Sequence, residues 1–240
     1  MTDKPSRQTR AVRAAVDADE RFGAVMPPIY LSSSFTFAGF GEPRAYDYTR
    51  TGNPTRDDLA AAINALEGGA GATVTGSGMA AIHLALQLLD PGDLLIGPVD
   101  CYGGTYRLLR RCAARGLFRV ELVDQTDDGA LQAALAKNPR LLWVETPTNP
   151  LLRVVDLARV TALGHEAGAL VAVDNTFLSP ALQRPLEFAA DLVVHSTTKY
   201  LNGHSDALGG AVVAATDELH ACMQQWANTL GLSGPPFDSY

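Results

Sequence analysis

Short apolar runs alternate with amphipathic segments from about residue 55 to the end of the chain. Most of the runs are uninterrupted, which is typical of strands buried on both faces of a sheet. They lie at 72–75, 94–96, 120–123, 141–144, 170–173 and 192–194, with 211–214 as a further candidate. Helical patterns lie at about 55–66, 79–89, 106–115, 130–136, 157–167 and 216–230. This order predicts an α/β fold with a mostly parallel sheet that is covered by helices.

Residues 1–54 lack this alternation. The segment shows little regular periodicity and is rich in Ser, Thr, Pro and Gly, as in Pro27-Pro28 and Ser32-Ser33-Ser34. We therefore predict an extended N-terminal arm over residues 1–54. The unit that contains the sheet is predicted over residues 55–240.

Polar residues follow the ends of several predicted strands. The carboxyl ends of parallel strands face the ligand crevice of such a sheet, so these residues are expected to share one site. The clusters are Gly76-Ser77-Gly78-Met79, Asp100-Cys101-Tyr102, Glu145-Thr146-Pro147-Thr148-Asn149-Pro150, Asp174-Asn175-Thr176 and His195-Ser196-Thr197-Thr198-Lys199.

Lys199 and Asp174 are the main candidates for chemistry at this edge of the sheet. A lysine that forms a Schiff base must be neutral, so it needs neighbours and partial burial that favour the neutral amine. Ser196 and Thr198 precede Lys199 and can donate hydrogen bonds to a phosphate. Asp174 ends a very apolar strand, where a carboxylate without a partner costs on the order of 3–5 kcal/mol. A protonated pyridine nitrogen is a suitable partner. Each residue alone also fits a plainer interpretation, as a surface lysine or a capping aspartate.

The chemistry of the side chains alone does not decide the role of several other positions. Gly76-Ser77-Gly78-Met79 lies between a strand and a helix N-terminus, which suits one phosphate. Because Ala81 replaces the third glycine of a Gly-x-Gly-x-x-Gly fingerprint, a nucleotide-binding protein is a weak alternative. Tyr102 fits either a core tyrosine or a ring stacked on a pyridine. Tyr48 and Arg50 lie in the arm, and arginine is well shaped to bind phosphate.

The composition narrows the class of protein. Hydrophobic residues make up 47% of the chain and charged residues 19%, as in soluble globular proteins. The 26 acidic and 19 basic residues give a net charge of −7, which argues against a nucleic-acid partner. Arg107, Arg110, Arg111 and Arg115 recur on one predicted helix, and a solvated face is favoured for all of them except Arg107.

The cysteines and the N-terminus indicate where the protein acts. Cys101, Cys112 and Cys222 are odd in number and lack metal-ligand spacing, which argues against a disulfide scaffold and a metal site. Residues 1–10 are polar, and no apolar run reaches membrane-spanning length. We expect a cytoplasmic protein with neither a signal peptide nor a membrane partner.

Taken together, these segments resemble the Cys/Met-metabolism family of fold-type I enzymes, which depend on pyridoxal 5′-phosphate (PLP). The motifs that carry the resemblance are Tyr48-Thr49-Arg50-Thr51-Gly52-Asn53-Pro54-Thr55, Gly76-Ser77-Gly78-Met79, Asp174-Asn175-Thr176-Phe177 and Ser196-Thr197-Thr198-Lys199-Tyr200-Leu201-Asn202-Gly203-His204. The likeness runs from about residue 25 to residue 240. Residues 41–48, 100–107 and 149–156 are most similar to bacterial members that carry out γ-replacement.

The resemblance implies PLP as the cofactor. The residues it assigns to cofactor binding are Lys199, Asp174, Tyr102, Gly78, Met79, Ser196, Thr198, Tyr48, Arg50 and Asn149. Lys199 would carry PLP as a Schiff base and, with Tyr102, would be catalytic. Asp174 would pair with the pyridine nitrogen, and the ring of Tyr102 would stack on that of the cofactor.

The remaining implied roles concern the phosphate, the substrate and the assembly. Tyr48 and Arg50 would bind the phosphate of an adjacent subunit's cofactor, which implies a homo-oligomer, usually a tetramer built as a dimer of dimers. Asn149 would contact the 3-oxygen of the cofactor. Arg107 would receive a carboxylate of the substrate's acyl group, and the substrates would be small amino acids.

The implied reaction is the replacement of the acyl group of an activated homoserine by cysteine. A lyase or a sulfhydrylase with the same site is an alternative, and so is a catalytically inactive PLP-binding fragment. Family members continue with a smaller C-terminal domain. The resemblance therefore leads us to expect a truncated large domain here, with the C-terminal small domain absent.

Overall fold

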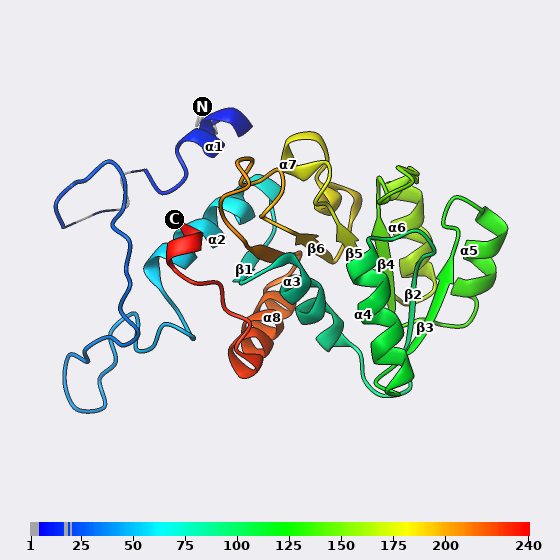
Figure 1. Ribbon diagram of the computed structural model, residues 1–240, viewed down its shortest axis with the longest axis horizontal. Helices are drawn as coiled ribbons and strands as arrows, with labels where there is room; N and C mark the ends of the chain where they lie inside the picture. Colours follow the sequence, from blue (N-terminus) through cyan, green and yellow to red (C-terminus); the bar gives the residue numbers. More distant parts are fainter. Residues whose placement is uncertain (1–4, 17–18, 20) are drawn as a thin grey trace.

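A seven-stranded sheet forms the centre of the computed structural model, which describes residues 5–16, 19 and 21–240 (Figure 1). The strand order is β1-β7-β6-β5-β4-β2-β3. β7 pairs antiparallel with both of its neighbours, and the other pairs are parallel. The expected mostly parallel sheet is confirmed, including the further strand candidate. The strands are β1 (Gly71–Thr75), β2 (Leu94–Pro98), β3 (Arg119–Val123), β4 (Leu141–Glu145), β5 (Leu170–Asp174), β6 (Leu192–His195) and β7 (Gly210–Ala214).

Helices pack on both faces of this sheet (Figure 1). The longer ones are α2 (Pro54–Glu67), α3 (Gly78–Ala85), α4 (Gly103–Ala114), α5 (Asp128–Leu135), α6 (Leu157–Glu166) and α8 (Asp217–Leu230). Side chains of β4 show how the layers divide, because successive residues of a strand face opposite sides. Trp143 packs in the core that α3, α4 and α8 cover, whereas Leu142 and Val144 pack in the core that α5 and α6 cover. Both faces are therefore buried, as the continuous apolar runs predict.

The hydrophobic pattern of the sequence does not predict the short helical elements. They are α1 (Arg7–Val12), α7 (Ser179–Leu182) and the 3₁₀ turns η1 (Leu86–Leu88), η2 (Pro185–Phe188) and η3 (Phe237–Ser239). The helix expected over 79–89 is α-helical only to Ala85 and then tightens into η1. Elements of one turn show too little periodicity to be recognised, since the helical repeat is itself 3.6 residues.

The described part of the predicted arm has little regular structure. It contains α1 and isolated bridges between Ser34 and Tyr48 and between Gly39 and Glu42. Figure 1 shows it as the blue segment that reaches away from the sheet. The arm returns to the body at α2, where the backbone N–H of Tyr30 donates to Thr55 Oγ1 at 2.9 Å. The domain boundary at residue 54 remains a prediction.

Among the residues that the structure describes, no helix combines the length and the apolar character needed to cross a membrane.

Candidate active site

A cavity of about 610 Å³ lies at the carboxyl edge of the sheet, where β4, β5 and β6 end. Its lining includes Gly78, Met79, Tyr102, Asn149, Asp174, Ser196, Thr198 and Lys199. The structure thus brings together most residues that the sequence assigns to one site. The parallel strands explain this, because their carboxyl ends all reach the same edge. The role of each residue remains a prediction.

Asp174 is the last residue of β5 and is only 9% exposed. Its Oδ1 accepts a hydrogen bond from the backbone N–H of Thr176 at 3.1 Å. Burial raises the pKa of the Asp174 carboxyl above its ordinary value, and Thr176 and the ring of His195 partly offset that rise. An ionised carboxylate in this position would be stabilised by a cationic partner.

Lys199 lies in the turns that follow β6. Lysine occurs at three positions of the chain, and of these Lys4 lies outside the described residues and Lys137 forms a surface ion pair with Glu121. Lys199 lines the cavity but is exposed, so the expected partial burial is wrong for the single chain. The physical reason is local, because the backbone leaves the sheet after His195 and the turn that carries Lys199 lies at the surface.

The N-terminus of α3 forms another wall of the cavity. Ser77 Oγ accepts a hydrogen bond from the backbone N–H of Ala80 at 3.1 Å, while the amides of Gly78 and Met79 have no partner within the helix. Only glycine fits at position 78, because a Cβ atom there would lie 2.6 Å from Cβ of Ser196. This close approach places the positive end of the helix dipole beside the end of β6, which suits an anion.

The two hydroxyl residues predicted for the phosphate differ in their contacts. Thr198 Oγ1 donates to the carbonyl of Gly209 at 3.2 Å and accepts from its N–H at 3.0 Å. Ser196 donates its backbone N–H to Thr176 Oγ1 at 2.9 Å. Thr198 would have to exchange its donated bond to reach a phosphate.

Glu145 is a cavity residue to which the sequence analysis gives no role. It ends β4 beside Asp174 of β5, and it is 4% exposed. Its carboxylate accepts hydrogen bonds from the backbone N–H groups of Tyr102 and Asn149, each at 2.8 Å. Burial, followed by the proximity of Asp174, raises the pKa of Glu145 to about 8. Its sequence signal is the same as that of Asp174, a carboxylate directly after a buried strand.

Tyr102 directly precedes α4 as its N-cap residue and is not a core residue. Its side chain is 43% exposed and lines the cavity, so the interpretation as a buried core tyrosine is wrong. Glu145 fixes its backbone N–H, and the carbonyl of Tyr102 accepts from the N–H of Tyr106 at 2.9 Å. The ring is therefore carried by a backbone segment that is hydrogen-bonded on both sides.

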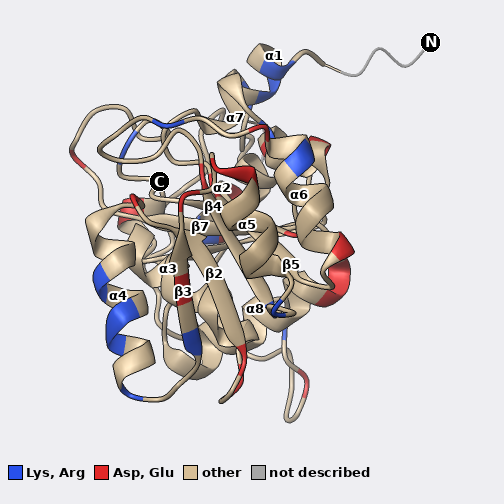
Figure 2. Ribbon diagram, turned by 90° about the vertical axis from the view of Figure 1, so that its right-hand side faces the viewer, with Lys and Arg blue, Asp and Glu red and all other residues tan. Residues whose placement is uncertain are grey.

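Three predicted residues do not line the cavity of their own chain: Tyr48, Arg50 and Arg107. Arg50 donates to the carbonyl of Asn228 in α8 at 2.7 Å and to its Oδ1 at 2.6 Å. The ring centroid of Tyr48 is 5.4 Å from Cζ of Arg50, and Tyr48 is 44% exposed. Arg107 is exposed on α4, where basic residues gather (Figure 2).

The family model described as "Cys/Met metabolism PLP-dependent enzyme" matches residues 8–240. The chain belongs to this family. Its cofactor is accordingly PLP. The match spans most of the arm as well as the sheet.

Similar proteins include several named cystathionine gamma-synthase. The one from Escherichia coli (strain K12) is 57% identical over 241 residues, which cover 100% of this chain and 62% of the relative. The one from Mycobacterium tuberculosis (strain H37Rv) is 47% identical, over 97% of this chain and 60% of the relative. The crystal structure of cystathionine gamma synthase from Xanthomonas oryzae pv. oryzae in complex with aminoacrylate and cysteine has a TM-score of 0.97 and 56% identity. The matched region covers 98% of this chain and 61% of the chain in that crystal structure. The chain thus spans about three fifths of the length of these relatives.

The cavity residues fit PLP on several physical grounds. Asp174 is a buried carboxylate whose ionised form needs a cationic partner, which a protonated ring nitrogen supplies. The N-terminus of α3 offers amides and a favourable dipole to a phosphate. Lys199 contributes a primary amine to the lining of the same cavity. The volume of about 610 Å³ falls within the range that accommodates small-molecule ligands.

Proposed function

We propose that the chain is the PLP-binding part of a cystathionine γ-synthase. This enzyme would replace the acyl group of O-succinyl-homoserine or O-acetyl-homoserine by cysteine, giving cystathionine and the free carboxylate, in methionine biosynthesis. The observation that carries the proposal is the meeting of Lys199, Asp174 and the N-terminus of α3 in one cavity. The 57% identity to the Escherichia coli cystathionine gamma-synthase supports the choice within the family.

The residues would divide the chemistry between them. PLP, when bound, supplies an electron sink for negative charge at the substrate α-carbon. Lys199 would hold the cofactor and then, as a free amine, move the protons at the substrate α- and β-carbons. Asp174 would keep the ring nitrogen protonated. Tyr102 would face the ring, and Glu145 would hold the backbone beneath both Tyr102 and Asn149.

Side chains outside the cavity of this chain would complete the binding sites for the phosphate and the substrate. Tyr48 and Arg50 would complete the phosphate site of a second copy of the chain, in a tetramer built as a dimer of dimers. Their position outside the cavity of their own chain supports this. Arg107 would receive the carboxylate of a succinyl group, and its exposure on α4 leaves it free to do so. The free thiols of Cys101, Cys112 and Cys222 support a cytoplasmic enzyme.

The test compares two reactions of the purified protein with PLP. Cystathionine formation from O-succinyl-homoserine and cysteine is measured by chromatography, and the cleavage of cystathionine alone is measured through released keto acid. We expect formation to exceed cleavage. Dominant cleavage would contradict the proposal and favour a lyase, an alternative supported by the relative named cystathionine beta-lyase in Lactococcus lactis, which is 40% identical.

A PLP-binding protein without turnover is a second alternative. The 240 residues cover 62% and 60% of the length of two relatives, so turnover has to be measured on this chain itself. A visible cofactor band without either reaction would favour this alternative. Turnover by the same protein would exclude it.

A further inference from the structure

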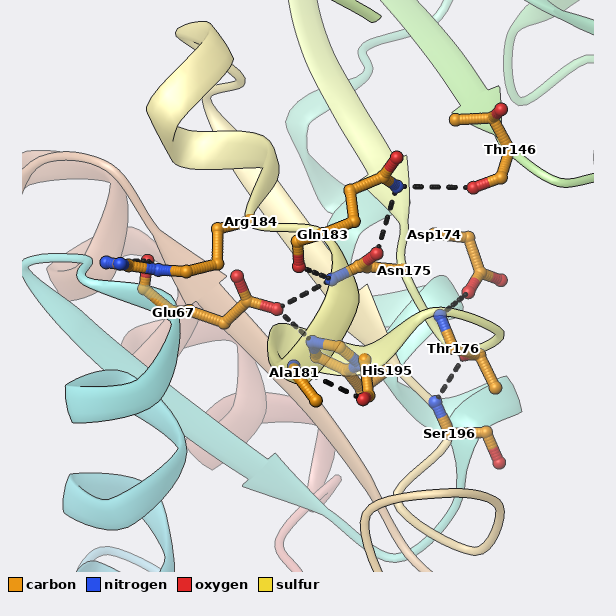
Figure 3. A network of polar contacts seen from close by, with 11 residues as sticks. Glu67, Thr146, Asp174, Asn175, Thr176, Ala181, Gln183, Arg184, His195 and Ser196 are labelled. Atoms are coloured by element: carbon orange, nitrogen blue, oxygen red, sulfur yellow. Dashed lines mark hydrogen bonds and ion pairs between the residues drawn. The ribbon is translucent and has the colours of Figure 1, made fainter. Parts of the chain in front are cut away.

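A carboxylate and an imidazole are buried together near the carboxyl ends of the strands (Figure 3). Glu67 ends α2 and His195 ends β6, and both are 0% exposed. Glu67 Oε1 lies 2.6 Å from His195 Nε2. Among the described residues, His195 is the ionisable group within ion-pairing distance of the Glu67 carboxylate. A carboxylate buried this deeply requires hydrogen-bonding partners, and the imidazole is one of them.

The pair is part of a network that joins three strand ends. Glu67 Oε1 also accepts from Asn175 Nδ2 at 2.9 Å. The Asn175 side chain forms two hydrogen bonds with Gln183, at 2.8 and 3.0 Å. Gln183 Nε2 then donates to the carbonyl of Thr146, after β4, at 3.2 Å. Figure 3 shows these contacts running from α2 across the ends of β6, β5 and β4.

Two members of this network adjoin cavity residues in the chain. Asn175 directly follows Asp174, and His195 directly precedes Ser196. A displacement of either side chain is therefore transmitted through a single peptide unit to a residue that lines the cavity. The charge is transmitted as well, because the ring of His195 favours the ionised form of the Asp174 carboxyl.

We propose that Glu67 and His195 are positioning residues that hold Asp174 in place to receive the ring nitrogen of the cofactor. The inference rests on the PLP site described above and adds to it two residues that do not line the cavity. Glu67 holds both His195, which precedes the cavity residue Ser196, and Asn175, which follows Asp174. The pair acts through Asp174 rather than on the substrate.

The test compares two cofactors that differ at a single ring position. The variants Glu67→Gln and His195→Gln keep a hydrogen-bonding side chain of similar size and remove the possibility of charge. Dissociation constants are measured by equilibrium dialysis for PLP and for its 1-deaza analogue, in which carbon replaces the ring nitrogen. We expect the preference for PLP over the analogue to fall about tenfold in each variant, equivalent to about 1.4 kcal/mol. The double variant should lose no more than either single variant, because the pair acts as one unit.

His220→Gln is the matched control. His220 is a partly buried histidine of α8 that packs against Gly71 at the opposite edge of the sheet. We expect it to leave the cofactor preference unchanged. Thermal unfolding of each cofactor-free variant shows whether it folds.

The outcomes separate this inference from the proposed function. Weakened binding of both ligands by the same factor would show a structural role alone and overturn the inference, as would an unchanged preference in a folded variant. Failure of the unaltered protein to bind PLP would remove the proposed function and this inference with it. Selective loss of PLP binding in Glu67→Gln and His195→Gln, but not in His220→Gln, would establish the inference.

Discussion

The sheet buries its apolar side chains, whereas the arm exposes many of them to solvent. Val171 and Val173 of β5 are 0% exposed, whereas Leu31 of the arm is 69% exposed and Phe40 is 107% exposed. In the sheet, parallel neighbours and covering helices bury each strand within one chain. In the arm, the described residues have few such neighbours. The comparison shows that the packing of the sheet is determined within one chain, whereas the packing of the arm is not.

The residues predicted for the site differ in the same way between the sheet and the arm. The residues at the sheet edge, such as Asp174 and Lys199, line one cavity, while Tyr48 and Arg50 of the arm do not. A parallel sheet fixes where its strand ends meet. An exposed arm has no comparable constraint, so a residue on it reaches a site only where another surface positions it.

The largest expected effect is at the sheet edge. Replacing Lys199→Ala removes the amine that would bind PLP covalently, so the visible band of the bound cofactor should disappear on dialysis. Absorbance spectroscopy after dialysis measures it, and Lys137→Ala, at a surface ion pair with Glu121, is the control. A borohydride-reducible adduct retained in Lys199→Ala would move the covalent attachment to another residue.

Truncation of one apolar side chain in each region tests the difference in burial directly. Leu142→Ala in β4 removes a fully buried side chain and should lower the free energy of unfolding by about 2–5 kcal/mol. Leu31→Ala in the arm should change it by less than about 0.5 kcal/mol in the monomer. Urea denaturation measures both. Equal losses would show that the arm is packed as firmly as the sheet.

The pH dependence of stability tests the buried carboxyl groups of the sheet edge. Burial raises the pKa of Glu145 from an ordinary value of 4.5 to about 8, so the folded chain holds a proton that the unfolded chain releases. The free energy of unfolding therefore falls as the pH rises from about 4.5 to about 8. The loss is on the order of 3–5 kcal/mol. Burial also raises the pKa of Asp174, which acts in the same direction.

Glu145→Gln should flatten this dependence in urea denaturation of the cofactor-free protein. Glu121→Gln, on the exposed edge strand β3, should leave the slope unchanged. An equally steep slope in Glu145→Gln would mean that other groups cause it.

The smallest expected effect is in the arm. Arg50→Ala should weaken PLP binding by the oligomer about tenfold, because a phosphate would lose one charged partner. Equilibrium dialysis measures it, and Arg44→Ala, another exposed arginine of the arm, is the control. Unchanged PLP affinity would leave Arg50 with its contacts to Asn228 and no role in the site.

Sequence patterns predict the sheet because burial on both faces demands continuous apolar runs, and β2, β4, β5, β6 and β7 each contain one. The same reasoning places Asp174 and Lys199 near the carboxyl edge. It does not give Glu145 a role, because one carboxylate after a strand carries no information about its hydrogen-bond partners. The contacts of Thr198 with Gly209 are equally invisible, since they depend on how a loop folds back.

The amino-acid sequence by itself determined the strands, the longer helices and the family, because local hydrophobic periodicity and continuous motifs encode them. Only the tertiary structure decided that β7 lies between β1 and β6, and that Glu67 meets His195 from 128 positions away in the chain. Such pairings depend on the packing of all the layers together, and no short segment of the chain contains that information.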